Sequence, residues 1–357
     1  MFSVQFLRRT AGHPYVLNCA SGWRVAGHTA LILGAGFSKP AGGPLLRELL
    51  SAEMIGRSDA DEDVLAALSD MLEARRAVPN QEGTTIEELF TEVWREARTA
   101  GNLRVGDSAW PAAELLSGLT THLASVCGAL HVRRSGGLWK MYVGFLGKLW
   151  KECRSLEVIT FNYDLLLEQL LDDVGLRFSY GAADGIAFDD NRRRARMHRS
   201  GHHLELLKLH GSSNWGICRG CRKAGRYLDQ VTAFEKPYVP LRRRTCPWCR
   251  DKFLETGIIP PILGKAGESR HMGPVWLQAR RALRRAREII VIGYSLPPSD
   301  AEAVSLFREI EGLLKRPRIT VVCGSKGAPP SYGQVFSGFT DAKKRFEGFA
   351  EDFVSAD

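Results

Sequence analysis

The feature that most constrains the fold of this chain is a series of short apolar runs, each followed by a glycine or a polar turn. The runs cover residues 29–33, 156–160, 204–209, 289–292 and 318–322. Apolar runs of this length are typical of strands that are buried on both faces. Their alternation with helical periodicity predicts a doubly wound parallel α/β sheet, similar to the Rossmann fold. Because ligands of such sheets bind beyond the carboxyl ends of the strands, the residues after each run are the candidates for function.

Two long segments interrupt this alternation. Residues from about 45 to 152 are predicted to be a mostly helical insert, with a loop at 101–111. Two sets of apolar residues there each share one helical face: Leu45, Leu46, Leu49 and Leu50, then Ile86, Leu89, Phe90 and Val93. Residues of about 215–257 are rich in arginine and lack periodicity, which predicts a small insert organised by a metal. Further helices are predicted over 275–288 and around Phe346, Phe349 and Phe353.

The charge balance and the termini bear on partners and location. The chain has 357 residues and a formal net charge of +9, from 49 Lys and Arg against 40 Asp and Glu. This balance indicates a phosphate-bearing or nucleic-acid partner, or else a solvated basic surface. No apolar run approaches the roughly 20 residues of a membrane helix. The Arg8–Arg9 pair is not followed by the apolar core of a signal peptide. We therefore expect a soluble, cytoplasmic protein with no membrane partner.

Four of the eight cysteines form two C-x2-C pairs, Cys218 with Cys221 and Cys246 with Cys249. Each pair can grip a metal, and four thiolates suit tetrahedral Zn2+. A site closed by four cysteines has no open coordination position, so the predicted zinc is structural. The alternatives are redox pairs or unbound thiols, and the surrounding arginines leave a nucleic-acid-binding ribbon open.

Glycine-containing turns follow two of the predicted strands. The turn at 34–38 reads GAGFS and leads from a strand toward a helix, where glycines let the backbone approach a phosphate. The turn at 293–298 reads GYSLPP and suits contacts with a ribose or phosphate. For both segments the alternative is a tight turn that binds no ligand.

Polar side chains follow two further strands. Asn162 and Asp164 come after the 156–160 strand, with a spacing that places them on one side of an extended chain. They could orient a ribose or a water, while the alternative for Asp164 is an Asx turn that caps the next helix. His210 follows the 204–209 strand and could act as a general base, although a lone histidine is more often structural.

Taken in order, these motifs resemble those of the sirtuin family of NAD-consuming enzymes, over about residues 33–325. Residues 34–44, GAGFSKPAGGP, are similar to the family's GAGxSxxxGIP loop, and residues 160–164, TFNYD, are similar to TQNID. His210-Gly211 resembles the catalytic HG, and residues 293–300, GYSLPPSD, resemble GTSL. The resemblance implies an NAD-binding domain over 29–325, between an N-terminal extension (1–28) and a C-terminal segment with a helix (326–357).

The resemblance also implies a role for each matching residue. Asn162 and Asp164 would lie near the nicotinamide and its ribose, and His210 would be the base that acts on a ribose hydroxyl. The NAD+ site would be lined by Gly34, Ala35, Gly36, Ser38, Arg47, Gly293 and Ser295. The four paired cysteines stand where the family has its structural zinc module. The implied chemistry is cleavage of the nicotinamide–ribose bond, with Asn162 able to position water as the acceptor.

Departures from the family pattern favour water as that acceptor. Protein deacylases have a stretch similar to RPxVVxFGE after the zinc module, whereas residues 258–265 read IIPPILGK and lack its acidic and aromatic residues. The chain is more similar to a divergent bacterial branch that includes NAD hydrolases of anti-phage defence. The interpretation is an NAD+ glycohydrolase that depletes NAD, regulated by a partner chain or by oligomerisation. The alternatives are an NAD-dependent protein deacylase or ADP-ribosyl transferase, and a non-catalytic zinc-containing binding module.

Overall fold

The computed structural model describes residues 27–77, 85–153, 155–181, 204–218, 224–226, 249, 254–263, 272–297 and 299–356. Within these residues the main element is a seven-stranded sheet with the order β12-β11-β10-β1-β4-β6-β5. All its pairings are parallel. The strands are β1 (His28–Leu33), β4 (Ser155–Thr160), β5 (Phe178–Ser179), β6 (Leu204–Lys208), β10 (Glu288–Ile292), β11 (Arg318–Val322) and β12 (Thr340–Asp341). Each predicted apolar run forms a strand, so the predicted parallel α/β sheet is confirmed.

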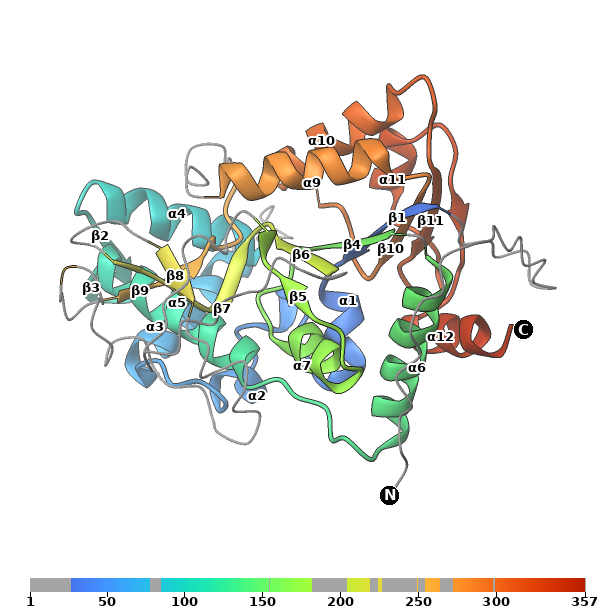
Figure 1. The fold of residues 1–357 in the computed structure, drawn as a ribbon. Coiled ribbons are helices and arrows are strands. Elements are labelled where there is room, and N and C mark those ends of the chain that lie inside the picture. The colour runs from blue at the N-terminus through green and yellow to red at the C-terminus, as the bar shows by residue number, and fades with distance from the viewer. Residues whose placement is uncertain are drawn as a thin grey trace.

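Helices cover both faces of this sheet (Figure 1). On one face lie α9 (Gly273–Arg285) and α10 (Ala301–Glu311), with α11 (Pro330–Val335) against α10. On the other face lie α1 (Ala35–Ser38), α6 (Gly137–Glu152), α7 (Leu166–Asp173) and α12 (Phe346–Ser355). The helix predicted over 275–288 ends earlier, because Ala286 is extended and Glu288 already belongs to β10.

The order of the strands reverses at β1, which makes the junction of β1 and β10 a topological switch point. In the strand register, Leu33 of β1 is paired with both Ile292 and Thr160, and Thr160 is paired with Lys208. The turns that follow β1, β4, β6 and β10 therefore all begin in one layer, at the carboxyl edge of the sheet.

Most of the segment predicted as a helical insert builds a second core, with α2 (Ala52–Ile55), α3 (Glu62–Arg76), α4 (Ile86–Arg98) and α5 (Ala112–Gly128). Its last helix, α6, packs into the core of the main sheet instead. The predicted apolar face of α4 is buried, and Ile258 and Ile262 from far along the chain pack into the same core. Thr85 and Glu88 form a capping box that fixes the start of α4.

Two predictions within this insert are wrong. Residues 101–111 are not a loop but an antiparallel hairpin of β2 (Asn102–Val105) and β3 (Ser108–Pro111), which turns at Gly106 with φ +58°. The leucines at 45–50 do not share a face of an α-helix, because the chain forms only one 3-10 turn there, η2 (Leu46–Glu48). A single turn is too short to form an apolar helical stripe.

The predicted metal-organised insert contains a small antiparallel sheet with the order β8-β7-β9. β7 (Gly211–Cys218) begins directly after His210, and it pairs with β8 (Ala224–Arg226) and β9 (Leu254–Ile258). Both β7 and β9 pack against α5. None of the helices in the described part of the chain combines the length and apolar character that a bilayer crossing requires.

Candidate functional site

The turn after β1 packs directly against the turn after β10. The Gly34 amide donates to Ile292 O at 3.0 Å, and the Gly36 amide donates to Gly293 O at 2.9 Å. A Cβ on Gly36 would lie 2.6 Å from Gly293 Cα, and a Cβ on Gly293, whose φ is +66°, would lie 2.4 Å from Gly36 Cα. The glycines therefore serve first to bring two backbones into contact. The amides of Gly34 and Gly36 are used by main-chain carbonyls and do not face a phosphate.

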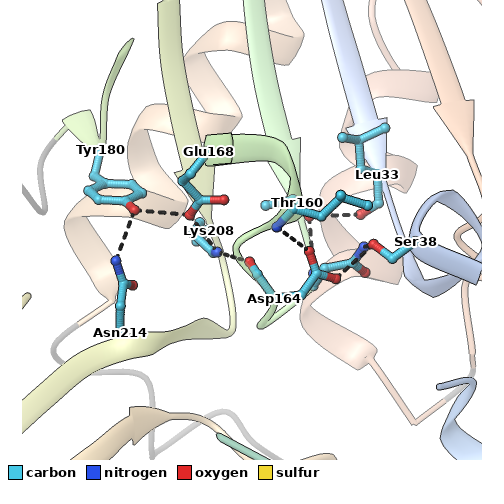
Figure 2. A network of polar contacts seen from close by, with 10 residues as sticks. Leu33, Ser38, Thr160, Asp164, Glu168, Tyr180, Lys208 and Asn214 are labelled. Carbon is cyan, nitrogen blue, oxygen red and sulfur yellow. Dashed lines mark hydrogen bonds and ion pairs between the residues drawn. The ribbon is translucent and has the colours of Figure 1, made fainter. Parts of the chain in front are cut away.

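Ser38 joins the turn after β1 to the turn after β4. Its hydroxyl donates to Asp164 Oδ2 at 2.7 Å and accepts from Asn162 Nδ2 at 3.1 Å (Figure 2 shows the Ser38–Asp164 contact). The same Nδ2 donates to Gly34 O at 2.9 Å. Because a carbonyl can only accept, the nitrogen of the Asn162 amide must face Gly34, which fixes the orientation of the side chain and turns Oδ1 away. We call Asn162, Ser38 and Asp164 the Ser38 network.

Asp164 is buried, and its carboxyl accepts two hydrogen bonds. Besides binding Ser38, it accepts the Leu166 amide on Oδ1 at 3.1 Å at the start of α7, so the Asx turn weighed from the sequence is present. The helix cap weighed with it is wrong, because Leu165 and not Asp164 is the N-cap of α7. Burial raises the pKa of this carboxyl above its ordinary value, while the charge of Lys208 and the hydrogen bond from Ser38 act to lower it. The carboxyl thus helps to fix Ser38, and through Ser38 it fixes Asn162.

A buried polar chain that the sequence analysis did not identify extends from Asp164. Lys208 Nζ donates to Asp164 O at 2.5 Å and to Glu168 Oε1 at 2.8 Å (Figure 2). Tyr180 Oη donates to the same Glu168 oxygen at 2.9 Å, and Asn214 Nδ2 donates to Tyr180 Oη at 3.3 Å. The signal available in the sequence was a lysine that ends an apolar strand, since a lysine is rarely fully buried unless it is paired.

His210 lies at the end of β6, with 6% of its surface exposed. Its Nε2 is 3.2 Å from Asp300 Oδ2, and the Tyr294 hydroxyl donates to that same oxygen at 2.7 Å. Tyr294 stacks on Phe161 with ring centroids 3.8 Å apart, and the Phe161 ring meets the His210 ring at 5.1 Å and 68°. Residues that follow β4, β6 and β10 therefore surround the imidazole. The sequence analysis singled out His210 but neither Asp300 nor Tyr294, although both lie in the GYSLPPSD segment.

Three other residues predicted to line the site differ in their burial. Ala35 opens α1 and is partly buried. Arg47 in η2 and Ser295 after β10 are exposed. Within the described part of the chain, no hydrogen bond or ion pair joins the side chain of Arg47 or Ser295 to the Ser38 network.

The cysteine pairs are described only in part. Cys218 ends β7 and Cys249 is exposed, whereas Cys221 and Cys246 lie outside the described residues. Among the residues that are described, no group of three His, Cys, Asp or Glu side chains is placed to hold a metal ion. The zinc site therefore stays a prediction.

No family model matches this sequence, and no curated protein matches it. Among solved structures the chain is similar to several Sir2 homologues, and each match covers 91% of this chain. A mutant homologue in complex with ADP-ribose has 15% identity, 90% of that chain covered and a TM-score of 0.42. A Sir2 homologue in complex with NAD has 14% identity, 87% covered and a TM-score of 0.41. Sir2 bound to an acetylated peptide has 15% identity, 90% covered and a TM-score of 0.38. At such identities and scores, the likeness does not decide which reaction this chain performs.

Proposed function

We propose that this chain is an NAD+ glycohydrolase that splits NAD+ into nicotinamide and ADP-ribose. The observation that carries the proposal is the Ser38 network together with His210, at the carboxyl edge of the sheet and beside its switch point. Doubly wound sheets bind dinucleotides at this place. The motifs around these residues resemble those of sirtuins, which supports NAD+ as the substrate. The departures at 258–265 support water as the acceptor.

In the proposed reaction the bond between the ribose C1′ and the nicotinamide nitrogen breaks, and its electron pair neutralises the pyridinium ring. A water oxygen bonds to C1′, and the proton that it releases passes by way of a ribose hydroxyl to His210 and then to solvent. Asn162 positions the water through Oδ1, because Gly34 and Ser38 fix its amide nitrogen. The chain thus contributes placement and charge stabilisation rather than a covalent step. Gly34, Ala35, Gly36, Ser38, Arg47, Gly293 and Ser295 are proposed to line the dinucleotide.

The test is to incubate the purified protein with NAD+, with and without an acylated peptide, and to quantify nicotinamide and ADP-ribose. We expect free ADP-ribose without peptide, and a loss of roughly 10²–10⁴-fold in His210→Ala and Asn162→Ala. His131→Ala and Asn102→Ala are the matched controls, because both side chains are exposed and lie outside the proposed site. These two variants should keep the wild-type rate.

Each other result identifies a different function. Acyl-ADP-ribose that forms only with peptide would contradict hydrolysis and identify a deacylase. ADP-ribose that becomes attached to a protein would identify a transferase. If NAD+ stays intact under every activating condition, including concentrated protein and added nucleic acid, the chain is a binding module and not an enzyme.

We also propose a structural zinc held by Cys218, Cys221, Cys246 and Cys249. The support is the strand register, in which Cys218 at the end of β7 is paired with Leu254 at the start of β9. In the sequence, Cys221 follows Cys218 by three residues, and Cys249 precedes Leu254 by five. Zinc would fix the tip of this small sheet and take no part in the reaction. Metal analysis should find one zinc per chain and its loss in Cys249→Ser, whereas a folded, metal-free wild type would contradict the site.

The cellular role remains part of the proposal. Unrestrained NAD+ hydrolysis depletes a shared metabolite, so we propose control by a partner chain or by assembly of identical chains. The resemblance to the divergent bacterial branch supports a cytoplasmic effector of anti-phage defence. The positive charge leaves a nucleic acid as a candidate trigger.

A further inference from the structure

Asp300 is a buried carboxyl that faces the histidine of the proposed site. Only 2% of its surface is exposed, and its Oδ2 lies 3.2 Å from His210 Nε2 and 2.7 Å from the Tyr294 hydroxyl. A carboxylate held away from water is unfavourable unless it is paired and hydrogen-bonded. An imidazole and a phenol on one oxygen provide such a pair.

We propose that Asp300 is the positioning residue of His210: it orients the imidazole through Nε2 and stabilises the imidazolium that forms when the ring takes up a proton. This inference rests on the proposed function only for the reaction in which His210 takes part. The pairing of Asp300 with His210 does not depend on that reaction. The 3.2 Å contact between Nε2 and Oδ2 is close but is not an aligned hydrogen bond. When the imidazole turns so that Nε2–H points at the carboxylate, proton exchange with a substrate hydroxyl would use Nδ1. A carboxylate on one ring nitrogen sets the tautomer in this way.

Two contacts fix the position of Asp300: a main-chain hydrogen bond to Pro297 and the hydrogen bond from the Tyr294 hydroxyl. The Asp300 amide donates to Pro297 O at 3.0 Å, so the carboxyl stands at a defined place just before α10. Tyr294 is fixed as well, because its ring stacks on Phe161 and its main-chain oxygen accepts the Tyr332 hydroxyl at 2.7 Å. The carboxyl, the phenol and the imidazole are thus held together by residues that follow three different strands.

The other titratable groups that face this cluster are three tyrosines and Glu87. Burial, reinforced by the charge of Asp300, raises the pKa of Tyr294 well above its usual value, and burial does the same for Tyr163 and Tyr332. From α4, Glu87 accepts the Ser299 hydroxyl at 2.5 Å and adds negative charge on that side. An imidazole has an ordinary pKa near neutrality, so it is the member of this set suited to exchange a proton.

The test compares wild type with Asp300→Asn, which keeps the shape of the side chain and removes its charge. Nitrogen-15 NMR of the His210 ring gives its tautomer and its titration, and kcat/KM against pH gives the functional consequence. We expect the Nε2–H tautomer in the wild type. In Asp300→Asn, the titration and the acidic limb of the rate profile should move to lower pH by about one unit, because a nearby negative charge favours the protonated ring. The rate should fall roughly 10²-fold.

Two further variants separate charge from packing. Tyr294→Phe removes the hydroxyl but keeps the ring on Phe161 and the Asp300 carboxylate, so its His210 titration should not move to lower pH. Asp61→Asn changes an exposed N-cap of α3 that asparagine serves equally well, and it should match the wild type in rate and in titration.

The outcomes distinguish this inference from the proposed function. An unchanged His210 titration in Asp300→Asn, or an Nδ1–H tautomer in the wild type, would overturn the pairing. The second measurement needs no variant, so a failure of Asp300→Asn to fold does not remove the test. If the wild type leaves NAD+ intact while the titration shifts as expected, the proposed reaction is wrong and the pairing stands.

Discussion

Asp164 holds Ser38 and accepts the Leu166 amide with a carboxyl that burial pushes toward its neutral form. Burial raises its pKa above the ordinary value of 3.8, although Lys208 and Ser38 oppose the shift. Between 3.8 and the raised value, the folded chain retains a proton that the unfolded chain has released. The folded state therefore binds more protons in that window, and the free energy of unfolding of the wild type falls as the pH rises through it.

Replacing Asp164 with asparagine should remove this pH dependence. The free energy of unfolding of Asp164→Asn, relative to wild type, should rise with pH through the window by up to about 1.4 kcal/mol per pH unit. Urea denaturation at a series of pH values measures the difference, and Asp61→Asn at the exposed N-cap of α3 serves as the reference for a carboxyl in water. A difference that stays constant with pH would show that the carboxyl is not perturbed.

Single residues differ in how well the sequence predicts them. Ser38, Asn162 and Asp164 could be found because each follows a recognisable strand, and the structure brings them into one hydrogen-bonded network. Asp300 could not be found in that way. It comes several residues after its strand, past a positive-φ Leu296 and just before α10, and only the folded turn brings its carboxyl next to His210. Local spacing does not carry that information.

At the scale of elements, the contact between the turns after β1 and β10 is the least tolerant part of the frame. Both turns are backbone packed on backbone, so no flexible side chain can move aside for an added methyl group. Gly293 also has φ +66°, a conformation that disfavours any residue with a Cβ.

Gly293→Ala should therefore lower the free energy of unfolding by about 2–4 kcal/mol, and it should displace the Ser38 network. Gly147→Ala in the middle of α6 is the matched control, because a Cβ there meets nothing within 4 Å. That change should stabilise the chain by about 0.5–1 kcal/mol. Urea denaturation of both variants checks the contrast, and equal effects would contradict the described contact.

Elements were predictable where a single pattern dominated. The five inner strands of the main sheet could be read from their apolar runs, and α4 could be read from its apolar face and its capping residues. The edge strands β5 and β12 were not predicted, because each has only two residues. The hairpin at 102–111 could not, because its strands have only four residues each, and although β2 alternates polar and apolar side chains, β3 does not. Its pairing is supported by packing against α4 and α5, which local sequence does not encode.

At the scale of the whole molecule, the C-terminal helix α12 packs against the residue that precedes Ser38 of the candidate site. Phe346 of α12 lies 4.9 Å from the Phe37 ring and 5.2 Å from the Tyr142 ring, between ring centroids. The Tyr142 hydroxyl donates to Phe37 O at 2.5 Å. Since Phe37 directly precedes Ser38, this aromatic cluster fixes the main chain from which the Ser38 hydroxyl projects.

Phe346→Ala should lower the free energy of unfolding by about 3–5 kcal/mol, through lost burial and the cavity left behind. Val354→Ala on the same helix is the control, because that side chain is 40% exposed and its loss should matter by less than about 0.5 kcal/mol. Thermal and urea denaturation measure both variants. A small effect at Phe346 would mean that α12 does not support the fold as described.

The sheet was predictable from sequence, but the two-core arrangement was not. The second core joins α3, α4 and α5 to Ile258 and Ile262, which lie far away in sequence. Patterns within each segment reveal which residues are apolar. They do not reveal that two separate insertions bury their apolar faces against each other.

The two insertions share one further property. Both leave the main sheet at its carboxyl edge, and α6 and α9 then return the chain to β4 and β10. Segments before these two return helices can lengthen, shorten or be exchanged without changing any strand pairing of the main sheet. In evolutionary terms the sheet is a frame with two insertion points at its carboxyl edge, where the candidate site lies. New specificities or controls can be added there by recombination while the frame beneath is inherited unchanged.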